Sequence, residues 1–155
     1  MGAVAGDQPL GRLLATALTA VIDELHERLA DAGWPRVRPM WGFVLLAVRD
    51  RPRNIGEVGE LLGVTKQAAA KVVASLVDEG LVERRADPGD RRAAVLGLTP
   101  DGRRFLADAE AAYQAIETGW AEVAGRRDVA ALRRAVSAVL RSRYGPQEPP
   151  VRPVL

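Results

Sequence analysis

The sequence predicts a mainly α-helical fold with one small β-hairpin, and three patterns carry that prediction. Apolar residues recur at helical spacing over most of the chain. Two short helical segments near the middle are joined by a very tight turn. A charged segment rich in turn residues then separates two strand-like runs. The 155 residues, 48% of them hydrophobic, suit a single compact domain.

The N-terminal part of the chain is predicted to form two helices of different character. Residues 10–31 show the three-four apolar spacing of a helix with one wide apolar stripe. Residues 33–39 contain two prolines and are predicted to be a loop. The helix expected at 40–48 is apolar on every side, which predicts a position at the centre of the fold. Residues 1–9 are expected to be a flexible arm.

A helix-turn-helix is predicted from residue 54 onward. Asn54 with Glu57 three positions later is typical of a capping box, which starts a helix through residue 62. Gly63 suits the end of that helix. Thr65 can cap the next helix, predicted over 66–79, with its side-chain oxygen. Only one residue separates it from Gly63. So short a connection joins two helices at a fixed angle.

A β-hairpin is predicted directly after these helices, with strands at 81–86 and 91–98. Between them, Pro88 and Gly89 suit the central positions of a type II turn, because proline fixes the first φ and glycine accepts a positive second φ. This hairpin would be the wing of a winged helix-turn-helix spanning residues 54–99.

Two more helices are predicted to close the fold. Thr99 followed by Pro100 matches a helix cap with proline at the first helical position, and the helix runs to about residue 124. The last helix is expected at 129–143, with one apolar face. Four prolines after Gly145 predict a tail at 145–155 without helix.

The second helix of the helix-turn-helix has an outward face suited to DNA. Residues 61–77 include no acidic side chain, and Lys66, Gln67, Ala70 and Lys71 lie on that face. Lysine can donate to guanine, glutamine can pair with adenine, and small side chains allow close approach to the major groove. A core helix with an alanine-rich outer face explains the pattern equally well, so this helix alone leaves both interpretations open.

The hairpin favours the DNA interpretation. Arg84 and Arg85 on its first strand, and Arg91 and Arg92 at its tip, can follow a phosphate backbone or enter a narrow minor groove. Asp90 can accept from the Arg92 guanidinium and hold it extended. The alternative is an exposed turn whose charges pair with one another. A helix-turn-helix followed at once by a charged hairpin favours binding of double-stranded DNA.

Composition argues against several other classes of function. The chain has no cysteine, so disulfides, thiolate metal sites and thiol redox chemistry are absent. The single histidine, His26, lies near Asp23 and Glu27, but a lone histidine rarely makes a metal site. Neither a catalytic set nor a phosphate-binding loop is found, so we expect no enzyme, metal or cofactor. The chain lacks a membrane span and a signal peptide, and we expect a soluble, cytoplasmic protein.

Residues 54–102, NIGEVGELLGVTKQAAAKVVASLVDEGLVERRADPGDRRAAVLGLTPDG, resemble the multiple-antibiotic-resistance regulator (MarR) family. The DPGDRR tip followed by LTPDG is the most specific part, and the order of elements extends the resemblance over residues 10–144. The resemblance implies a transcriptional regulator, and we expect it to act as a repressor. It also implies a homodimer held together by helices in 10–53 and 100–144. Two-fold symmetry then predicts a near-palindromic operator with half-sites ~10 base pairs apart.

The resemblance also implies roles for individual residues. It places the outward face of the second helix in the major groove and Arg92 in the minor groove, with Asp90 orienting Arg92. Two positions depart from the family pattern, because Ala70 stands where Ser or Thr is common and Gly59 replaces a common alanine. The predicted DNA-binding residues are Thr65, Lys66, Gln67, Ala70, Lys71, Arg84, Arg85, Asp90, Arg91 and Arg92.

Large aromatic residues lie outside the DNA-contacting stretch, and the resemblance implies a ligand cleft near the dimer interface. We hypothesise that an aromatic acid or similar apolar effector binds there, shifts the spacing of the two lobes and weakens DNA binding. Simple core packing is the alternative interpretation of these residues. A winged helix that docks a protein is the alternative function for the whole chain. The candidate ligand-binding residues are Trp34, Arg38, Met40, Trp41, Tyr113 and Trp120.

Overall fold

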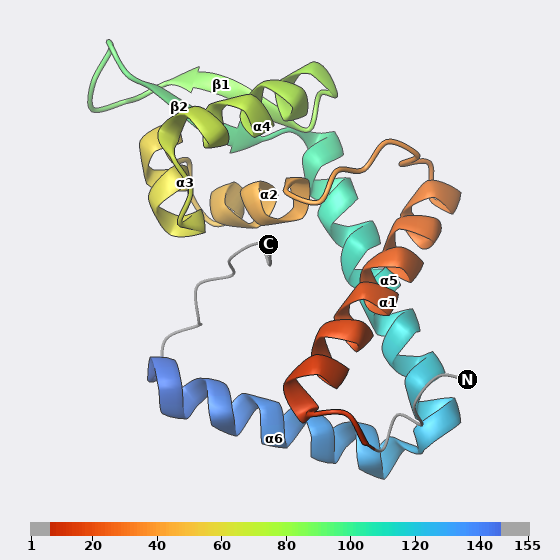
Figure 1. Ribbon diagram of the computed structural model, residues 1–155. Helices are drawn as coiled ribbons and strands as arrows, with labels where there is room; N and C mark the ends of the chain where they lie inside the picture. The colour runs from red at the N-terminus through yellow and green to blue at the C-terminus, as the bar shows by residue number, and fades with distance from the viewer. Residues whose placement is uncertain (1–6, 147–155) are drawn as a thin grey trace.

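The computed structural model describes residues 7–146, and within them six helices accompany one two-stranded hairpin (Figure 1). This confirms the predicted fold class. Residues 1–6 and 147–155, which hold most of the predicted arm and tail, lie outside the described residues. The elements are α1 Leu10–Asp31, α2 Trp41–Arg49, α3 Ile55–Leu62, α4 Lys66–Asp78, β1 Val82–Ala86, β2 Ala94–Leu98, α5 Pro100–Ala124 and α6 Arg126–Tyr144.

The helix-turn-helix and the hairpin occupy one end of the molecule. Helices α2, α3 and α4 gather there with β1 and β2, α1 and α5 run side by side away from them, and α6 lies across the opposite end (Figure 1). The hairpin projects outward from the helices at the first end. The candidate DNA-contacting elements are thus separated from α6 by the length of α5.

The core is centred on α2, as its uniformly apolar sequence predicted. Trp41, Val44, Leu45 and Val48 of this helix are buried. They belong to one cluster with buried side chains of the neighbouring elements, among them Phe105 of α5. Burial of four side chains from a helix of nine residues makes α2 the support on which the helix-turn-helix rests.

The predicted helix ends agree with the structure to within one residue, except at the start of α6. The structure starts α6 at Arg126, whereas the apolar pattern predicted a start near Val129. Gly125 explains the difference, because its φ of +91° ends α5 and turns the chain into α6 within a single residue. The first turn of α6 therefore carries arginines rather than apolar residues, which is why periodicity missed it.

The tip of the hairpin corrects one prediction. The Asp90 amide donates to the Asp87 carbonyl at 3.3 Å, so Pro88 and Gly89 are the central residues of a turn. A type II turn requires positive φ at the second of these, and Gly89 is not among the glycines with positive φ. The predicted type II turn is therefore wrong. The second strand also begins at residue 94 rather than 91, because the tip extends to Ala93.

A third piece of extended chain, not predicted from the sequence, joins the hairpin. The Leu96 amide donates to the Arg53 carbonyl at 2.8 Å, and the Arg53 amide donates to the Leu96 carbonyl at 3.3 Å. The Arg53 side chain donates from Nε to the Ala47 carbonyl at 2.6 Å, near the end of α2. This residue thus ties the wing to the central helix.

Apolar side chains on α1 and α6 remain exposed at the end distant from the hairpin. Only Leu25 and Leu29 of α1 are buried, and α6 has no buried residue. Eight leucines and valines on the two helices have exposed fractions between 37% and 67%. They are Leu10, Leu13, Leu14, Leu18, Leu132, Val136, Val139 and Leu140. Within residues 7–146, none of the helices is both long and apolar enough to cross a membrane.

Candidate DNA-binding interface

The start of α3 is held by a complete capping box. The Glu57 amide donates to Asn54 Oδ1, and the Asn54 amide donates to Glu57 Oε2, each at 2.9 Å. Arg51 Nη2 lies 3.1 Å from Glu57 Oε1. The hydrogen bond from the Asn54 amide, followed by that from Arg51, lowers the pKa of the Glu57 carboxyl below its ordinary value. Both caps predicted from the sequence are confirmed at this helix, because Gly63 ends it with a φ of +65°.

The lowered pKa of Glu57 predicts a pH-dependent contribution to stability. Because the folded state favours the ionised carboxylate, its contribution is present above the unfolded-state pKa and disappears as pH falls through the lower folded-state pKa. Glu57→Gln removes the titrating group and leaves an amide at the same position. We expect the difference in unfolding free energy between wild type and this variant to shrink as pH falls from 7 to about 3 in urea titrations. A difference that grows on acidification would contradict this account.

The turn between α3 and α4 brings the two helices close together. A Cβ on Gly59 would lie 3.1 Å from the Val64 carbonyl oxygen and 3.6 Å from Lys66 Cα. An alanine here would require the turn to move by a few tenths of an ångström. Gly59, whose effect on helix propensity alone is unfavourable, therefore allows a closer contact between α3 and α4.

Helix α4 presents two distinct faces. The Ala68 amide donates to Thr65 Oγ1 at 3.1 Å, which confirms the predicted cap. Ala69, Val73 and Leu76 are buried against the core. On the other side Thr65, Lys66, Gln67 and Lys71 are exposed, and Ala70 is half-buried. The predicted contact residues of this helix are thus brought together on one solvent-facing surface, which we call the α4 face.

A hydrogen-bond chain that the sequence did not predict fixes α4 to α2. Trp41 is 3% exposed, and its Nε1 donates to Ser75 Oγ at 2.9 Å. Ser75 Oγ in turn donates to the Val72 carbonyl at 2.7 Å. Trp41 was a candidate ligand-binding residue, but its indole N–H is occupied and its ring is buried. Its partner lies 34 residues away in the chain, so no local pattern could have identified the pair.

Replacing Ser75 with alanine should loosen this attachment. The variant removes the acceptor of the Trp41 N–H, and we expect the unfolding free energy to fall by about 1 kcal/mol. Thr118→Ala is a matched control, because its Oγ1 also donates to a carbonyl of its own helix, at 2.9 Å, but is exposed. Urea denaturation should show no more than about 0.5 kcal/mol for the control. Equal losses in both variants would mean that the Trp41 contact has no special effect.

The tip of the wing consists of two consecutive turns, each closed by an aspartate. Asp87 Oδ1 accepts from the Gly89 amide at 2.8 Å, and Asp90 Oδ1 accepts from the Arg92 amide at 2.9 Å. The Ala93 amide donates to the Asp90 carbonyl at 3.0 Å, which places Arg91 and Arg92 at the corners of the second turn. The carboxylate of Asp90 therefore contacts the backbone of Arg92, not its guanidinium as expected. Asx turns of this kind fix the local backbone.

The two arginines of β1 do not form one cluster, because successive residues of a strand point to opposite faces. Glu83 binds the Arg85 guanidinium on the same face of the hairpin. Gly97 pairs with Glu83 across the hairpin and leaves room for the Arg85 guanidinium, since a Cβ on Gly97 would lie 3.2 Å from Arg85 Cζ. Arg84 lies on the other face and is exposed. We therefore expect Arg84 and Arg85 to contribute separately, with the charge of Arg85 partly balanced.

The start of α5 is built onto the end of α4. Thr99 Oγ1 donates to the Gly80 carbonyl at 2.5 Å, and the Thr99 amide donates to the Leu81 carbonyl at 3.2 Å. The Gly102 amide donates to Thr99 Oγ1 at 3.0 Å, which confirms the predicted cap. A Cβ on Gly102 would lie only 2.0 Å from the Leu81 carbonyl oxygen. The glycine of the LTPDG segment is thus required by a close backbone contact.

The candidate ligand-binding residues are not all brought together. Trp34 Nε1 donates to Asp108 Oδ2 at 2.8 Å, and its ring lies edge-on to Phe105 with Arg104 stacked 4.7 Å from its centre. Beside it, a small cleft of about 120 Å³ is lined by Gly33, Trp34, Pro35, Arg36, Trp41, Glu79 and Leu81. Arg36 crosses this cleft to Glu79, with Nη2 3.3 Å from Oε2.

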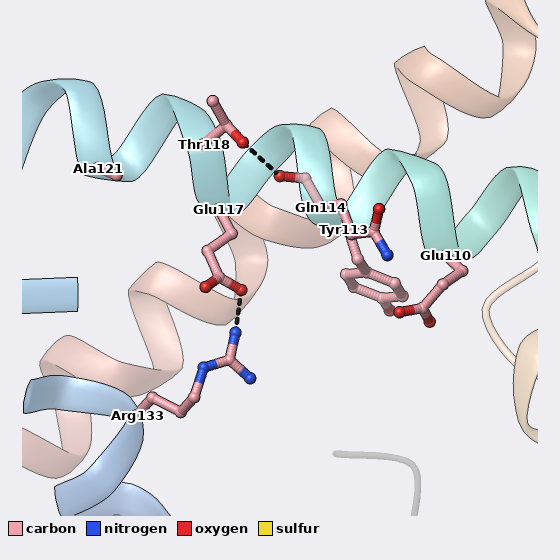
Figure 2. Close-up of a pocket in the computed structure, with 7 residues that line it drawn as sticks. All are labelled: Glu110, Tyr113, Gln114, Glu117, Thr118, Ala121 and Arg133. Atoms are coloured by element: carbon pink, nitrogen blue, oxygen red, sulfur yellow. Dashed lines mark hydrogen bonds and ion pairs between the residues drawn. The ribbon is translucent and has the colours of Figure 1, made fainter. Parts of the chain in front are cut away.

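Tyr113 lies in a separate and larger cleft between α5 and α6 (Figure 2). This cleft has a volume of about 550 Å³, and Glu110, Tyr113, Gln114 and Glu117 extend into it from α5. Arg133 of α6 meets Glu117 across it. Burial and then Glu110 raise the pKa of the Tyr113 phenol above its ordinary value. Arg38, Met40 and Trp120 line neither cleft. Among residues 7–146, no group of three potential metal ligands includes His26.

The region that holds the helix-turn-helix is similar to known proteins. The model of the MarR family matches residues 37–93. An uncharacterized protein of Mycobacterium tuberculosis is 40% identical over 63 residues, covering 41% of this chain and 44% of that protein. The HTH-type transcriptional regulator PetP of Rhodobacter capsulatus is 38% identical over 88 residues, covering 52% of this chain and 48% of PetP. The matches thus span about half the length of these curated relatives.

Solved structures extend the similarity to the whole fold. The transcriptional repressor CouR, bound to a 23-mer DNA duplex, is 27% identical with a TM-score of 0.70. That match covers 90% of this chain and 99% of CouR. The winged helix-turn-helix, its flanking helices and the sequence relatives are thus all similar to the MarR family of transcriptional regulators, whose model matches residues 37–93.

Proposed function

We propose that this protein is a transcriptional regulator that binds double-stranded DNA, with the α4 face in the major groove and the wing tip against the backbone and minor groove. The observation that supports this proposal most directly is the arrangement of charge on α4 and the wing tip. Lys66 and Lys71 are exposed on a face without acidic residues. The two aspartates of the tip contact backbone amides, so the guanidinium groups of Arg91 and Arg92 face solvent at the corners of a turn. We place such a regulator in the cytoplasm, where it meets the chromosome.

The residues in this proposal have distinct expected contributions. Lys66, Gln67 and Lys71 can reach base edges, and Ala70 supplies close approach without a hydroxyl contact. Thr65 caps the helix whose amide dipole faces the phosphates. Arg84, Arg85 and Arg91 would contact phosphates, which positions the protein without reading sequence. The similarity to CouR, a repressor solved on a DNA duplex, supports this assignment.

Salt dependence of duplex binding tests the proposal against the alternative of a protein-docking module. Each phosphate contact lowers the slope of log affinity against log salt by about 0.9. We expect a steep slope and selection of a defined sequence from a random duplex library. Weak binding that is insensitive to salt and unselective in sequence would instead favour the docking module.

A homodimer completes the proposal. The exposed leucines and valines of α1 and α6 form apolar faces that a second copy of the chain would bury. Two symmetric α4 faces would read a near-palindrome with half-sites ~10 base pairs apart. Footprinting should therefore protect two symmetric half-sites. Protection of a single asymmetric half-site would contradict the dimeric arrangement.

We further propose that the protein is a repressor released by an aromatic acid that binds beside Trp34 and Trp41. The cleft there has about 120 Å³, which is smaller than the cavity of about 150 Å³ known to hold benzene. Entry of such an effector would therefore separate Arg36 from Glu79, which caps the end of α4. A structure of CouR from Rhodococcus jostii bound to p-coumaroyl-CoA, 25% identical with a TM-score of 0.65, supports effector binding in this fold.

Tryptophan fluorescence tests the effector proposal. Phenolic acids titrated into the protein should quench its emission and weaken its affinity for the selected duplex. Arg36→Ala should change effector affinity, because the guanidinium is the cation nearest the cleft. Unchanged fluorescence together with unchanged duplex affinity would remove the proposal for the acids tried.

A further inference from the structure

The last helix is the most basic element of the fold. Helix α6 contains six arginines and one aspartate in 19 residues, a net charge of +5. The whole chain has a net charge of only +2, so the rest of the sequence carries −3. The positive charge of this protein is therefore concentrated at the end of the molecule opposite the wing (Figure 1).

Three of these arginines lie in a row. Arg127, Arg134 and Arg141 recur every seven residues, which places them along one side of the helix at intervals of roughly 10 Å. We call them the arginine row. Helical geometry puts the row on the side opposite the apolar residues Leu132, Val136 and Val139. Contacts made by the apolar face therefore leave the row in solvent.

The arginine row is unpaired within the described residues. Seven other arginines of the described residues form ion pairs, as Arg133 does with Glu117 of α5. In residues 7–146 no hydrogen bond or ion pair holds the guanidinium groups of Arg127, Arg134 or Arg141, and all three residues are exposed. Three unneutralised guanidinium groups at regular spacing form a surface for a polyanion.

Side chains around the row indicate which polyanion fits. Ala130 and Ala138 lie beside the arginines, so the surface is cationic and small, as the α4 face is. A helix that binds lipid inserts its apolar face, but the exposed apolar face of α6 is the one that a second copy of the chain would bury in the proposed dimer. Small residues between cations instead allow close approach to a phosphate backbone.

We propose that the arginine row binds the phosphate backbone of a second segment of double-stranded DNA. Its length, about 21 Å between the outer Cα positions, corresponds to roughly six base pairs. Helices α4 and α6 lie at opposite ends of α5 (Figure 1), so we expect that one short duplex would not reach both surfaces. The protein would therefore hold two DNA segments at once. This inference rests on the proposed function only in the choice of DNA as the polyanion.

Two variants that lose equal charge test the proposal. The row variant is Arg127→Gln, Arg134→Gln and Arg141→Gln, and the reading variant is Lys71→Gln, Arg91→Gln and Arg92→Gln. Affinity for a random-sequence duplex of about 30 base pairs is measured between about 50 and 200 mM NaCl by fluorescence anisotropy. A third variant with lysine at the three row positions retains the charge, and circular dichroism verifies helix content in all of them.

We expect the reading variant to retain salt-dependent binding of the random duplex through the row. Reading and row substitutions combined should weaken this binding by about tenfold or more and reduce the salt slope by about 2 to 3. The lysine variant should retain most of the binding. Wild type saturated with its selected duplex should also capture a second labelled duplex, and the row variant should not.

Three outcomes would overturn the proposal. The row substitutions could leave duplex binding and its salt slope unchanged, which would mean that the arginine row is only a solvated surface. They could dissociate the dimer in sedimentation, which assigns the row to a second copy of the chain. They could leave duplex binding unchanged but abolish binding to vesicles containing anionic lipid, which assigns it to a membrane. Failure of the proposed function would give a different result from failure of the arginine-row proposal. If the proposed function is wrong, the reading variant would select the same DNA sequence as wild type with equal affinity.

Discussion

Gly102→Ala is expected to destabilise the fold by more than about 3 kcal/mol. The new Cβ would lie 2.0 Å from the Leu81 carbonyl oxygen, and this neighbour is backbone rather than a flexible side chain. Relief requires α5 to move away from Leu81. That movement breaks the bonds from Thr99 to the Gly80 and Leu81 carbonyls. The measurement is the unfolding free energy from urea titration, followed by circular dichroism.

Gly119→Ala in the same helix is the matched control. A Cβ at Gly119 meets no atom within 4 Å, so the substitution adds only helix propensity. We expect this variant to gain up to about 1 kcal/mol. Changes in unfolding free energy of opposite sign at two glycines of one helix would separate the steric effect from helix propensity. A loss at Gly102 no larger than about 1 kcal/mol would contradict the close contact.

Arg92→Ala is expected to weaken binding to the selected duplex by about 1 to 3 kcal/mol while leaving the fold intact. The guanidinium stands at the corner of a turn whose backbone is already fixed by Asp90, so little ordering is needed on binding. Arg38→Ala, an exposed arginine in the loop before α2, is the control for loss of one positive charge. Anisotropy titrations at constant salt compare the three proteins.

Variants of Asp90 test whether this residue fixes the backbone of Arg92 or orients its guanidinium. Asp90→Asn keeps an oxygen that can accept from the Arg92 amide, and asparagine forms the same type of turn. We therefore expect duplex affinity equal to or higher than that of wild type. Asp90→Ala, which loses the acceptor, should bind more weakly than Asp90→Asn. If both variants bind equally weakly, the carboxylate charge acts on the guanidinium, as the family resemblance implied.

Local hydrogen bonds made the helix boundaries predictable. Asn54, Thr65 and Thr99 each accept from an amide three residues ahead, so a short stretch of sequence holds both partners. The same reasoning identified α2 as central, because a helix without a polar side must be buried. These features depend on neighbours along the chain, which is why composition and spacing were sufficient.

Contacts between distant residues were not predictable in this way. Trp34 and Asp108 are separated by 74 positions, and nothing near either one indicates the other. The indole groups of Trp34 and Trp41 therefore looked free for a ligand, whereas both N–H groups have partners inside the fold. At the candidate DNA-binding surface, sequence identified the residues of α4 and the tip. It could not show that Glu83 holds Arg85 or that Asp90 contacts backbone.

The exposed apolar faces of α1 and α6 have a consequence for how the protein responds to its own abundance. In the proposed dimer a second copy would bury them, and association would then be part of the free energy of folding. The unfolding temperature should then rise with protein concentration. DNA occupancy would also depend on more than the first power of that concentration, because each site would require two chains. A cell could therefore empty such a site by dilution during growth, without any effector.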